Sequence, residues 1–579
     1  MPLTLDQCSE ALLGRGYFPK ELPPPFQTRS LADKLVAVRG RWSAIGAAMS
    51  SRARNKLPLP SHSVRFDMAR KGHARRTLAI PNPINQFYLV EEIATHWAAI
   101  TALTESSTLS ITRCEIAPEG RAVPIPPLST LGEKRIVMYA ARGAILQTDL
   151  LSFYHSIYTH AIPWALHGKS VAKANRDTRD PAVFGNRIDE LVRSCQDGQT
   201  IGIPVGPDTS RIISEILLCS VEKKISAERL NLIASGFRYI DDFFLCFESL
   251  ADAEAVLTSL REACLHFDLQ LNAAKTDAFH AVAFNEETWP GEIVAMNLGF
   301  NGASQRRSLM RYFAGVIKIA KEMPSESIAS FAVRNSTRVL IARENWDIYE
   351  AFLLRMAREN SNCIDSVVKI ICTYAAIGFP ISPLVSAFVE RVVADHAPYN
   401  HHFEVAWALW LARSLDIRLS PTSSKFVVRM ENDVCAILAL HLRSRRLLSG
   451  RNLDWLPTVT SDDLRSDHWL LIYEAASRRG WRVSGAAAAV AADPFFAALR
   501  DEKISFYDSR AYNRPLNLPG IAFRLNLALE GRRRAVLPGA IMAVSEGVPG
   551  DYEQLGGDYG ADEFYPPIPE PDEIDDIPI

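Results

Sequence analysis

Three aspartates in this sequence stand at the ends of apolar segments, where carboxylates are rarely found. Asp241 and Asp242 are adjacent within GFRYIDDFFLCF, residues 236–247, and Asp149 closes the apolar run AILQTD. Two carboxylates on one tip repel each other, and each raises the pKa of the other unless a cation neutralises them. Mg²⁺ is the natural cation, because it takes hard oxygen ligands, commonly one or two carboxylates together with substrate phosphates.

The flanks of the aspartate pair predict two strands joined by a tight hairpin. Aromatic and β-branched residues precede Asp241 and follow Asp242, and a two-residue polar link between such runs is typical of a hairpin turn. Asn-Gly or Asp-Gly would suit that turn better than two acids. The dipeptide alone carries no information, since it recurs at Asp462-Asp463 and Asp575-Asp576. A solvent-exposed acidic turn is therefore the alternative to a cation site.

Asp149 favours the cation site over the acidic turn. Two Mg²⁺ ions held by carboxylates from adjacent strands serve in-line nucleotidyl transfer, where they activate the attacking hydroxyl and stabilise charge on the phosphate. Tyr154 follows Asp149 by five residues. An aromatic ring under the incoming sugar would exclude a 2′-hydroxyl, which favours DNA as the product.

The elements expected to position these residues alternate between strands and helices from 131 to 305. Strand-like runs occupy 135–150, 236–247 and 292–300, and helical patterns occupy 209–231 and 250–267. This alternation predicts a sheet with helices packed on it.

We expect four regions in the chain. Residues 1–130 form a loop-rich N-terminal and fingers region, and 131–305 form the sheet-containing catalytic region. Residues 306–535 read as successive amphipathic helices, which predicts an all-α, HEAT-like array. Residues 536–579 are acidic and rich in Pro and Gly, so we expect this tail to be disordered.

The 579-residue chain has a formal net charge of -2, but its charge is unevenly distributed. Basic residues dominate from Arg15 to Arg76, and no Lys or Arg follows Arg534. A basic front end suits a polyanionic partner, although a solvated basic face explains it equally well. The nine scattered cysteines suggest reduced thiols, and no run reaches the 18 apolar residues of a membrane span. These features predict a cytoplasmic location without membrane contact.

Several segments in order resemble the motifs of reverse transcriptases. YIDD at 239–242 resembles motif C, QTDLLSFYHSI at 147–157 motif A, and GQTIGIPVGPDTSRIISEILL at 198–218 motif B. LQLNAAKTDAF at 269–279 resembles motif D, MNLGF at 296–300 the strand that follows it, and RRTLAIPNPINQF at 75–87 the fingers strand. With the helical C-terminal region, the chain beyond about residue 70 is similar to the abortive-infection, or unknown-group, defence reverse transcriptases of bacteria.

This resemblance implies an α+β fingers-palm fold of the right-hand polymerase type, followed by an all-α HEAT-like repeat domain. It implies two Mg²⁺ ions, with Mn²⁺ as a substitute, on the catalytic Asp149, Asp241 and Asp242 and on Leu150. Deoxynucleoside triphosphates and a nucleic acid would be the ligands, homo-oligomerisation is expected, and the role would be antiphage defence. The residues implied in nucleotide binding are Arg76, Tyr154, Gly202, Pro204, Gly206 and Lys275, the last as proton donor or phosphate contact.

The mode of synthesis stays open at this point. Some members of the family make DNA without a template and prime on a protein hydroxyl, and the candidates here are Tyr552, Tyr559 and Tyr565. PNPINQ lacks the basic residue that mobile-intron enzymes carry before the fingers glutamine, so Arg113, Arg121, Lys134 or Arg135 would have to replace it. The alternatives are a conventional RNA-templated reverse transcriptase that copies a non-coding RNA, a catalytically inert nucleic-acid scaffold, and a cyclase or RNA polymerase.

Overall fold

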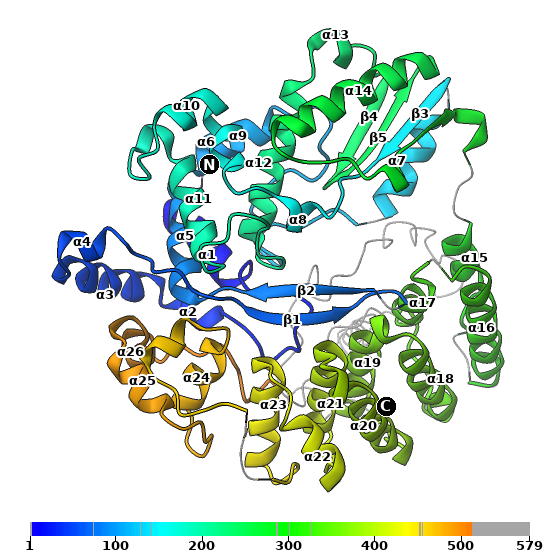
Figure 1. Cartoon of the computed structure of the whole chain (residues 1–579). Coiled ribbons are helices and arrows are strands. Elements are labelled where there is room, and N and C mark those ends of the chain that lie inside the picture. The colour runs from blue at the N-terminus through cyan, green and yellow to red at the C-terminus, as the bar shows by residue number, and fades with distance from the viewer. Residues whose placement is uncertain are drawn as a thin grey trace, which may run out of the picture.

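The computed structural model describes residues 3–511, apart from positions 73, 128, 141, 285–287, 300–301, 325, 451–452 and 454. Within these residues the chain is mostly helical and contains one two-stranded and one four-stranded sheet. Figure 1 shows the larger sheet with its helices on one side of the small sheet and an arc of helices on the other. No helix in the described part is long and apolar enough to cross a bilayer.

The N-terminal region carries the small sheet, an antiparallel hairpin of β1 and β2. Its register pairs Met68 with Arg76 and Ala69 with Arg75, so successive side chains of β2 point to opposite faces. The elements are α1 Leu5–Gly14, α2 Arg29–Asp33, α3 Leu35–Ala48, α4 Ser51–Arg54, β1 Val64–Ala69, β2 Arg75–Ile80, α5 Pro83–Thr95 and α6 Trp97–Glu105.

The second sheet has the strand order β4-β5-β3-β6, and every neighbouring pair is antiparallel. Leu146 of β3 and Leu245 of β5 lie in the main core, with α12 and α14 packed nearby. The elements are α7 Ser129–Tyr139, β3 Ala144–Thr148, α8 Phe153–Ser156, α9 Ala161–His167, α10 Lys169–Ala174, η1 Pro181–Val183, α11 Gly185–Ser194, α12 Asp208–Lys224, α13 Ala227–Leu230, β4 Ser235–Tyr239, β5 Asp242–Phe247, α14 Leu250–His266, η2 Ala273–Lys275, β6 Asp277–His280, η3 Ala281–Ala283 and α15 Trp289–Ala295.

The strand expected at 135–150 is present only in part, and the strand expected at 292–300 is wrong. Only Ala144–Thr148 of the 135–150 run is a strand, because the residues before it belong to α7. The buried ring of Tyr139 at the end of that helix packs on the second face of the sheet, with Ile145 and Cys246. The 292–300 run instead begins in α15, which has Pro290 in its first turn and buries Trp289 and Ile293 at helical spacing.

The remaining described residues form short helices that pack on their neighbours in sequence. For example, α16 contacts α17 and α18, and α21 contacts α19, α20 and α23. The elements are α16 Gly302–Glu322, α17 Ile328–Ser336, η4 Arg343–Asn345, α18 Trp346–Glu359, η5 Ser361–Cys363, α19 Ile364–Ala376, α20 Pro383–His396, η6 Ala397–Tyr399, α21 His402–Ser414, α22 Pro421–Val427, α23 Asp433–Ser444, η7 Ser461–Arg465, α24 Trp469–Ala476, α25 Ala486–Ala492 and α26 Pro494–Asp501.

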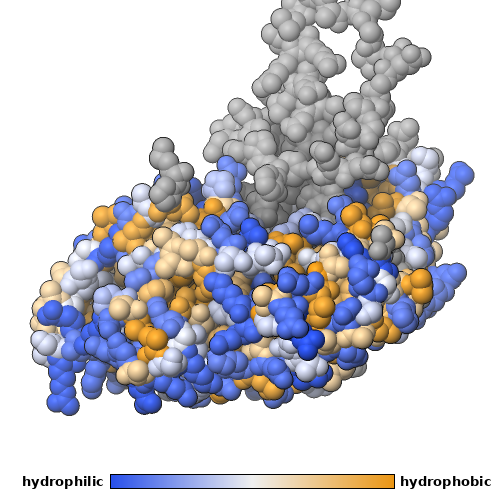
Figure 2. Space-filling view, turned by 90° about the horizontal axis from the view of Figure 1, so that it is seen from above, coloured by the Kyte–Doolittle hydropathy of each residue, from blue (hydrophilic) through white to orange (hydrophobic). Residues whose placement is uncertain are grey.

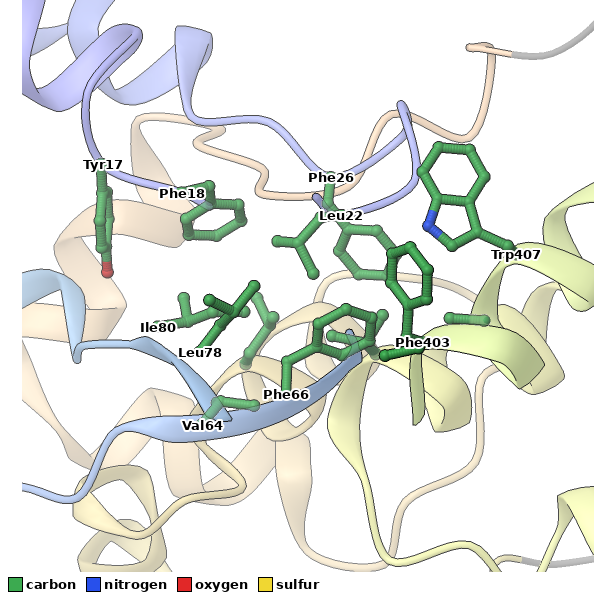
Figure 3. Close-up of a cluster of buried hydrophobic side chains, with 14 of the residues drawn as sticks. Tyr17, Phe18, Leu22, Phe26, Val64, Phe66, Leu78, Ile80, Phe403 and Trp407 are labelled. Atoms are coloured by element: carbon green, nitrogen blue, oxygen red, sulfur yellow. The ribbon is translucent and has the colours of Figure 1, made fainter. Parts of the chain in front are cut away.

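The helical region and the N-terminal region share one core. Figure 3 shows Phe66 and Leu78 of the hairpin between aromatic residues of the N-terminal segment and Phe403 of α21. Trp42 of α3 donates a hydrogen bond to the carbonyl of Phe495, 453 residues further along the chain. The β1–β2 hairpin is therefore fixed by contacts on two sides.

The face seen from above, outside the grey atoms, carries mixed polar and apolar side chains (Figure 2). Some of the positive charge near the N-terminus is paired within the molecule: Arg39 pairs with Glu91, and Arg41 pairs with Glu502. All nine cysteines are free thiols and all are buried.

Candidate active site

The four-stranded sheet brings Asp149 and the aspartate pair to the same edge. Thr148 of β3 pairs with Phe243 of β5. Because the strands are antiparallel, Asp149, one residue after Thr148, lies next to Asp242, one residue before Phe243. The fold therefore brings Asp149 beside Asp242, and Asp241 is in the adjoining turn. Asp149 is nearly buried, with 5% of its surface exposed.

The hairpin turn differs from the expected one by one residue. Tyr239 pairs with Asp242, so the two turn residues are Ile240 and Asp241, and Asp242 is the first residue of β5. Ile240 has φ 54, in the left-handed region that β-branched residues avoid. A residue held there costs on the order of 1–3 kcal/mol and persists only where its surroundings fix it.

Two hydrogen bonds fix the strained turn. The backbone N–H of Ile240 donates to Oγ1 of Thr112 at 3.1 Å, and Nη1 of Arg238 donates to the Ile240 carbonyl at 2.8 Å. Arg238 is fully buried and also pairs with Glu215 at 2.9 Å and Glu222 at 2.6 Å. The sequence analysis missed this network, although an arginine inside an apolar strand and two acids seven residues apart on one helix were visible signals.

Burial and neighbouring carboxylates raise the pKa values of Asp241 and Asp242. Burial, followed by the charges of Asp241 and Asp149, raises the pKa of Asp242 to about 7. Burial and the Asp149 charge also raise the pKa of Asp241, and the Lys275 ammonium opposes that rise. Nζ of Lys275 lies 2.5 Å from Oδ2 of Asp149, and this hydrogen bond raises the pKa of Lys275.

The donor atoms suit a hard cation. Oδ1 of Asp149 is buried and accepts no hydrogen bond within the described structure. No backbone N–H of a described residue donates to the carbonyl of Leu150. The three carboxylates do not place one oxygen each within 4.8 Å of the other two. Mutual repulsion gives the physical reason for that spread, and the Lys275 ammonium supplies part of the missing positive charge.

Residues 198–218, which resemble motif B, contact both the segment after β3 and the β1–β2 hairpin. The N–H groups of Gly202 and Ile203 donate to the carbonyls of Ile157 and Tyr154 at 2.8 and 2.9 Å, and Ala79 of β2 donates to Val205 at 2.8 Å. Gly202 has φ +81 and Gly206 has φ +131, and a Cβ on Gly206 would lie 2.6 Å from the Pro19 side chain. Both glycines are therefore required by backbone geometry.

Two of the remaining expected nucleotide contacts, Tyr154 and Arg76, lie near these acids. The Tyr154 hydroxyl lies 3.3 Å from Oγ of Ser214 on α12, and Asp241 is among the charges that act on the pKa of Tyr154. Pro204, between the two glycines of motif B, is buried. Arg76 is exposed and its charge lowers the pKa of Asp241.

Arg70 is a second hairpin arginine near the acids, and the sequence analysis did not single it out. Asp241 and Arg76 both act on its pKa, which burial lowers. Of the residues named as substitutes for the missing fingers base, Arg121 has a structural role instead: it pairs with Asp208 at 2.8 Å and donates to the Gly206 carbonyl at 2.6 Å. Arg135 lies over the Phe244 ring.

The candidate priming residues Tyr552, Tyr559 and Tyr565, and the whole acidic tail, lie outside the described residues. Their expected roles therefore stay predictions.

No protein-family model matches the chain. No curated protein matches it either. Among solved structures, apo telomerase from Candida tropicalis matches 67% of this chain and 71% of its own, with 10% sequence identity and a TM-score of 0.31. A TM-score this low assigns neither fold nor function.

Proposed function

We propose that this chain is a nucleotidyltransferase of reverse transcriptase type that polymerises deoxynucleoside triphosphates. The observation that carries the proposal is the buried, unpartnered Oδ1 of Asp149 beside two further carboxylates. A buried acceptor without a partner costs about 1–3 kcal/mol, and a strained turn adds to that cost. Several groups that destabilise the folded state and lie close together are typical of a functional site. Asp149, Asp241, Asp242 and the Leu150 carbonyl would hold two Mg²⁺ ions, with Mn²⁺ as a substitute.

The roles of the side chains follow from their positions. Bound Mg²⁺ would supply charge stabilisation at the reacting phosphate. Arg76 and Arg70 would bind the triphosphate from the fingers side, and Tyr154 would contact the sugar. Lys275 holds a proton within hydrogen-bond distance of Asp149, so it could donate that proton to the leaving pyrophosphate or contact a phosphate.

The resemblance to abortive-infection reverse transcriptases supports the biological side of the proposal. It favours a cytoplasmic, homo-oligomeric enzyme of antiphage defence that binds nucleic acid and makes DNA, without a template and on a protein primer. Two alternatives keep the same site: copying of a non-coding RNA, and ribonucleotide polymerisation or cyclisation. An inert scaffold is disfavoured, since it would keep three repelling acids without using them.

One reaction separates these modes. Purified full-length protein is incubated with Mg²⁺ and labelled deoxynucleoside triphosphates, singly and mixed, without nucleic acid, and the products are run on a denaturing gel before and after protease. Label that migrates with the protein and shifts after proteolysis supports protein-primed, untemplated synthesis. Product that appears only with a primed RNA or DNA supports templated synthesis, and no product under any condition contradicts the proposal.

Replacement of Tyr154 by alanine is expected to relax the choice of sugar. Removal of the ring opens space for a 2′-hydroxyl, so the ratio of ribonucleotide to deoxynucleotide incorporation should rise by roughly 100-fold. Tyr154→Phe is the matched control, because it keeps the ring and loses only the contact with Ser214. An unchanged ratio in Tyr154→Ala would exclude this residue as the sugar filter.

The Mg²⁺ requirement is expected to fall as pH rises. Without a cation the pKa of Asp242 is about 7, so below that pH a proton occupies the carboxyl and must leave before a metal binds. The half-saturating Mg²⁺ concentration should therefore decrease by up to about tenfold per pH unit below the pKa and level off above it. Calorimetric Mg²⁺ titration of nucleotide-free protein measures this, and a pH-independent value would contradict it.

A further inference from the structure

A second cluster of metal-binding side chains lies outside the palm. Three donors converge where α20 meets α21: His396 at the end of α20, His401 in the connecting loop and Glu404 in the first turn of α21. Among the described residues, this is the one group of three His, Cys, Asp or Glu side chains whose ligand atoms all lie within 4.8 Å of one another.

The chain reversal that builds this cluster is held by the backbone. Asn400 adopts φ 53, in the left-handed region that asparagine tolerates, and the N–H of His401 donates to the carbonyl of His396 at 3.2 Å. The turn thereby brings the two imidazoles together, with Nδ1 of His396 at 2.9 Å from Nδ1 of His401. Nδ1 of His396 lies 3.7 Å from Oε1 of Glu404.

These separations suit a tetrahedral ion. With zinc-ligand bonds of about 2.0–2.1 Å, two ligands of a tetrahedral Zn²⁺ are about 3.3 Å apart, and the observed 2.9 and 3.7 Å lie on either side of that value. Two imidazole nitrogens and one carboxylate oxygen favour Zn²⁺ over Mg²⁺, which prefers oxygen ligands.

We propose that His396, His401 and Glu404 bind one divalent transition-metal ion, with Zn²⁺ as the favoured ion. The site joins the helical region to the fingers hairpin, because the Glu404 carboxylate also accepts two hydrogen bonds from Arg75 of β2 at 2.9 and 2.7 Å. A carboxylate oxygen has two lone pairs, so Oε1 can serve Arg75 and an ion together. The neighbouring His402 has another task, since its Nδ1 accepts the backbone N–H of Asp67 at 3.2 Å.

The ion would stiffen the contact that holds the β1–β2 hairpin against α21. Arg75 and Arg76 are consecutive residues of β2 and point to opposite faces, so the side chain that holds the hairpin to α21 is next to the one near Asp241. A metal bound at Glu404 therefore fixes the far side of the strand that carries Arg76. Metal binding at these three residues does not depend on the proposed polymerase activity.

Metal titration of the full-length protein tests the proposal. After dialysis against a chelator, Co²⁺ should give the strong visible absorption of a tetrahedral site, and Zn²⁺ should displace it at one ion per chain. His396→Ala and His401→Ala should each weaken Zn²⁺ binding by at least about 100-fold, since even loss of a partner outside the ligand shell costs 10–100-fold. His62→Ala is the matched control, because this histidine is half exposed and pairs with Asp197.

The palm acids need a separate control, because they too can take divalent ions. They offer oxygen ligands, so their Co²⁺ complex would be octahedral and pale. The tetrahedral spectrum should therefore persist in Asp149→Asn and disappear in His396→Ala and His401→Ala. No tetrahedral spectrum in the unaltered protein, or a spectrum that survives both histidine replacements, would overturn the proposed site.

Discussion

Replacement of Asp241 by asparagine is expected to lower nucleotide incorporation by about 10³-fold or more. Metal-held charge stabilisation contributes several kcal/mol to such a reaction, and each 1.4 kcal/mol or so is a factor of ten in rate. The folded state should not suffer. Burial and the Asp149 charge raise the pKa of Asp241, which means that the ionised carboxylate destabilises the metal-free fold. The midpoint of thermal unfolding in a chelator should therefore rise.

The second aspartate pair of the described chain supplies the matched control. Asp462 is exposed on η7 and pairs with Arg465, so Asp462→Asn makes the same chemical change away from the palm and should leave incorporation unchanged. Single-turnover incorporation and thermal unfolding, measured on the same samples, separate catalysis from folding. Wild-type incorporation in Asp241→Asn would disprove the metal role of this residue.

The contacts between neighbouring strands could be predicted from the sequence. The apolar run that ends in Asp149 and the two runs around Asp241-Asp242 predicted three strands, and the pairing of β3 with β5 places Asp149 beside Asp242. The helix α14 also followed from its periodicity, since it buries one face against the sheet. The helix α12 is instead buried on all sides from Asp208 to Glu222. In these cases the determinants lie within a few residues of the element they determine.

The register of the turn could not be predicted in the same way. Two acids in a row suggested that both occupy the tip, but the pairing of Tyr239 with Asp242 places Ile240 there at φ 54. Local preference argues against a β-branched residue in that conformation, so only the surrounding contacts can hold it. The bonds from Thr112 and Arg238 are those contacts, and Thr112 is 128 residues away in sequence.

The contact between the β1–β2 hairpin and α21 is a second property that the sequence could not reveal. Arg75 looked like part of a basic surface, yet it pairs with Asp67 on the neighbouring strand and with Glu404, 329 residues later. No periodicity links positions so far apart. The helix α7 could not be predicted either. Its apolar residues resembled a strand, and the sequence does not show that Tyr139 packs against the sheet.

Replacement of Arg238 by methionine is expected to lower the free energy of unfolding by about 3–5 kcal/mol, because it leaves Glu215 and Glu222 buried without their cation. Urea unfolding followed by tryptophan fluorescence measures the loss. If this variant does not fold, Arg238→Lys keeps the charge and loses the two-sided geometry of the guanidinium, and it should show a smaller loss. Unchanged stability in both variants would contradict the structural role of the network.

A triple variant separates stability from the shape of the turn. Arg238→Met combined with Glu215→Gln and Glu222→Gln removes all three buried charges, and uncharged replacement of a buried ion network is often neutral or stabilising. Most of the lost stability should therefore return. Incorporation should remain low. In the unaltered protein Nη1 of Arg238 donates to the Ile240 carbonyl, and the triple variant lacks this bond, which fixes the turn that holds Asp241. Recovery of both stability and nucleotide incorporation would show that Thr112 alone is sufficient to hold the turn.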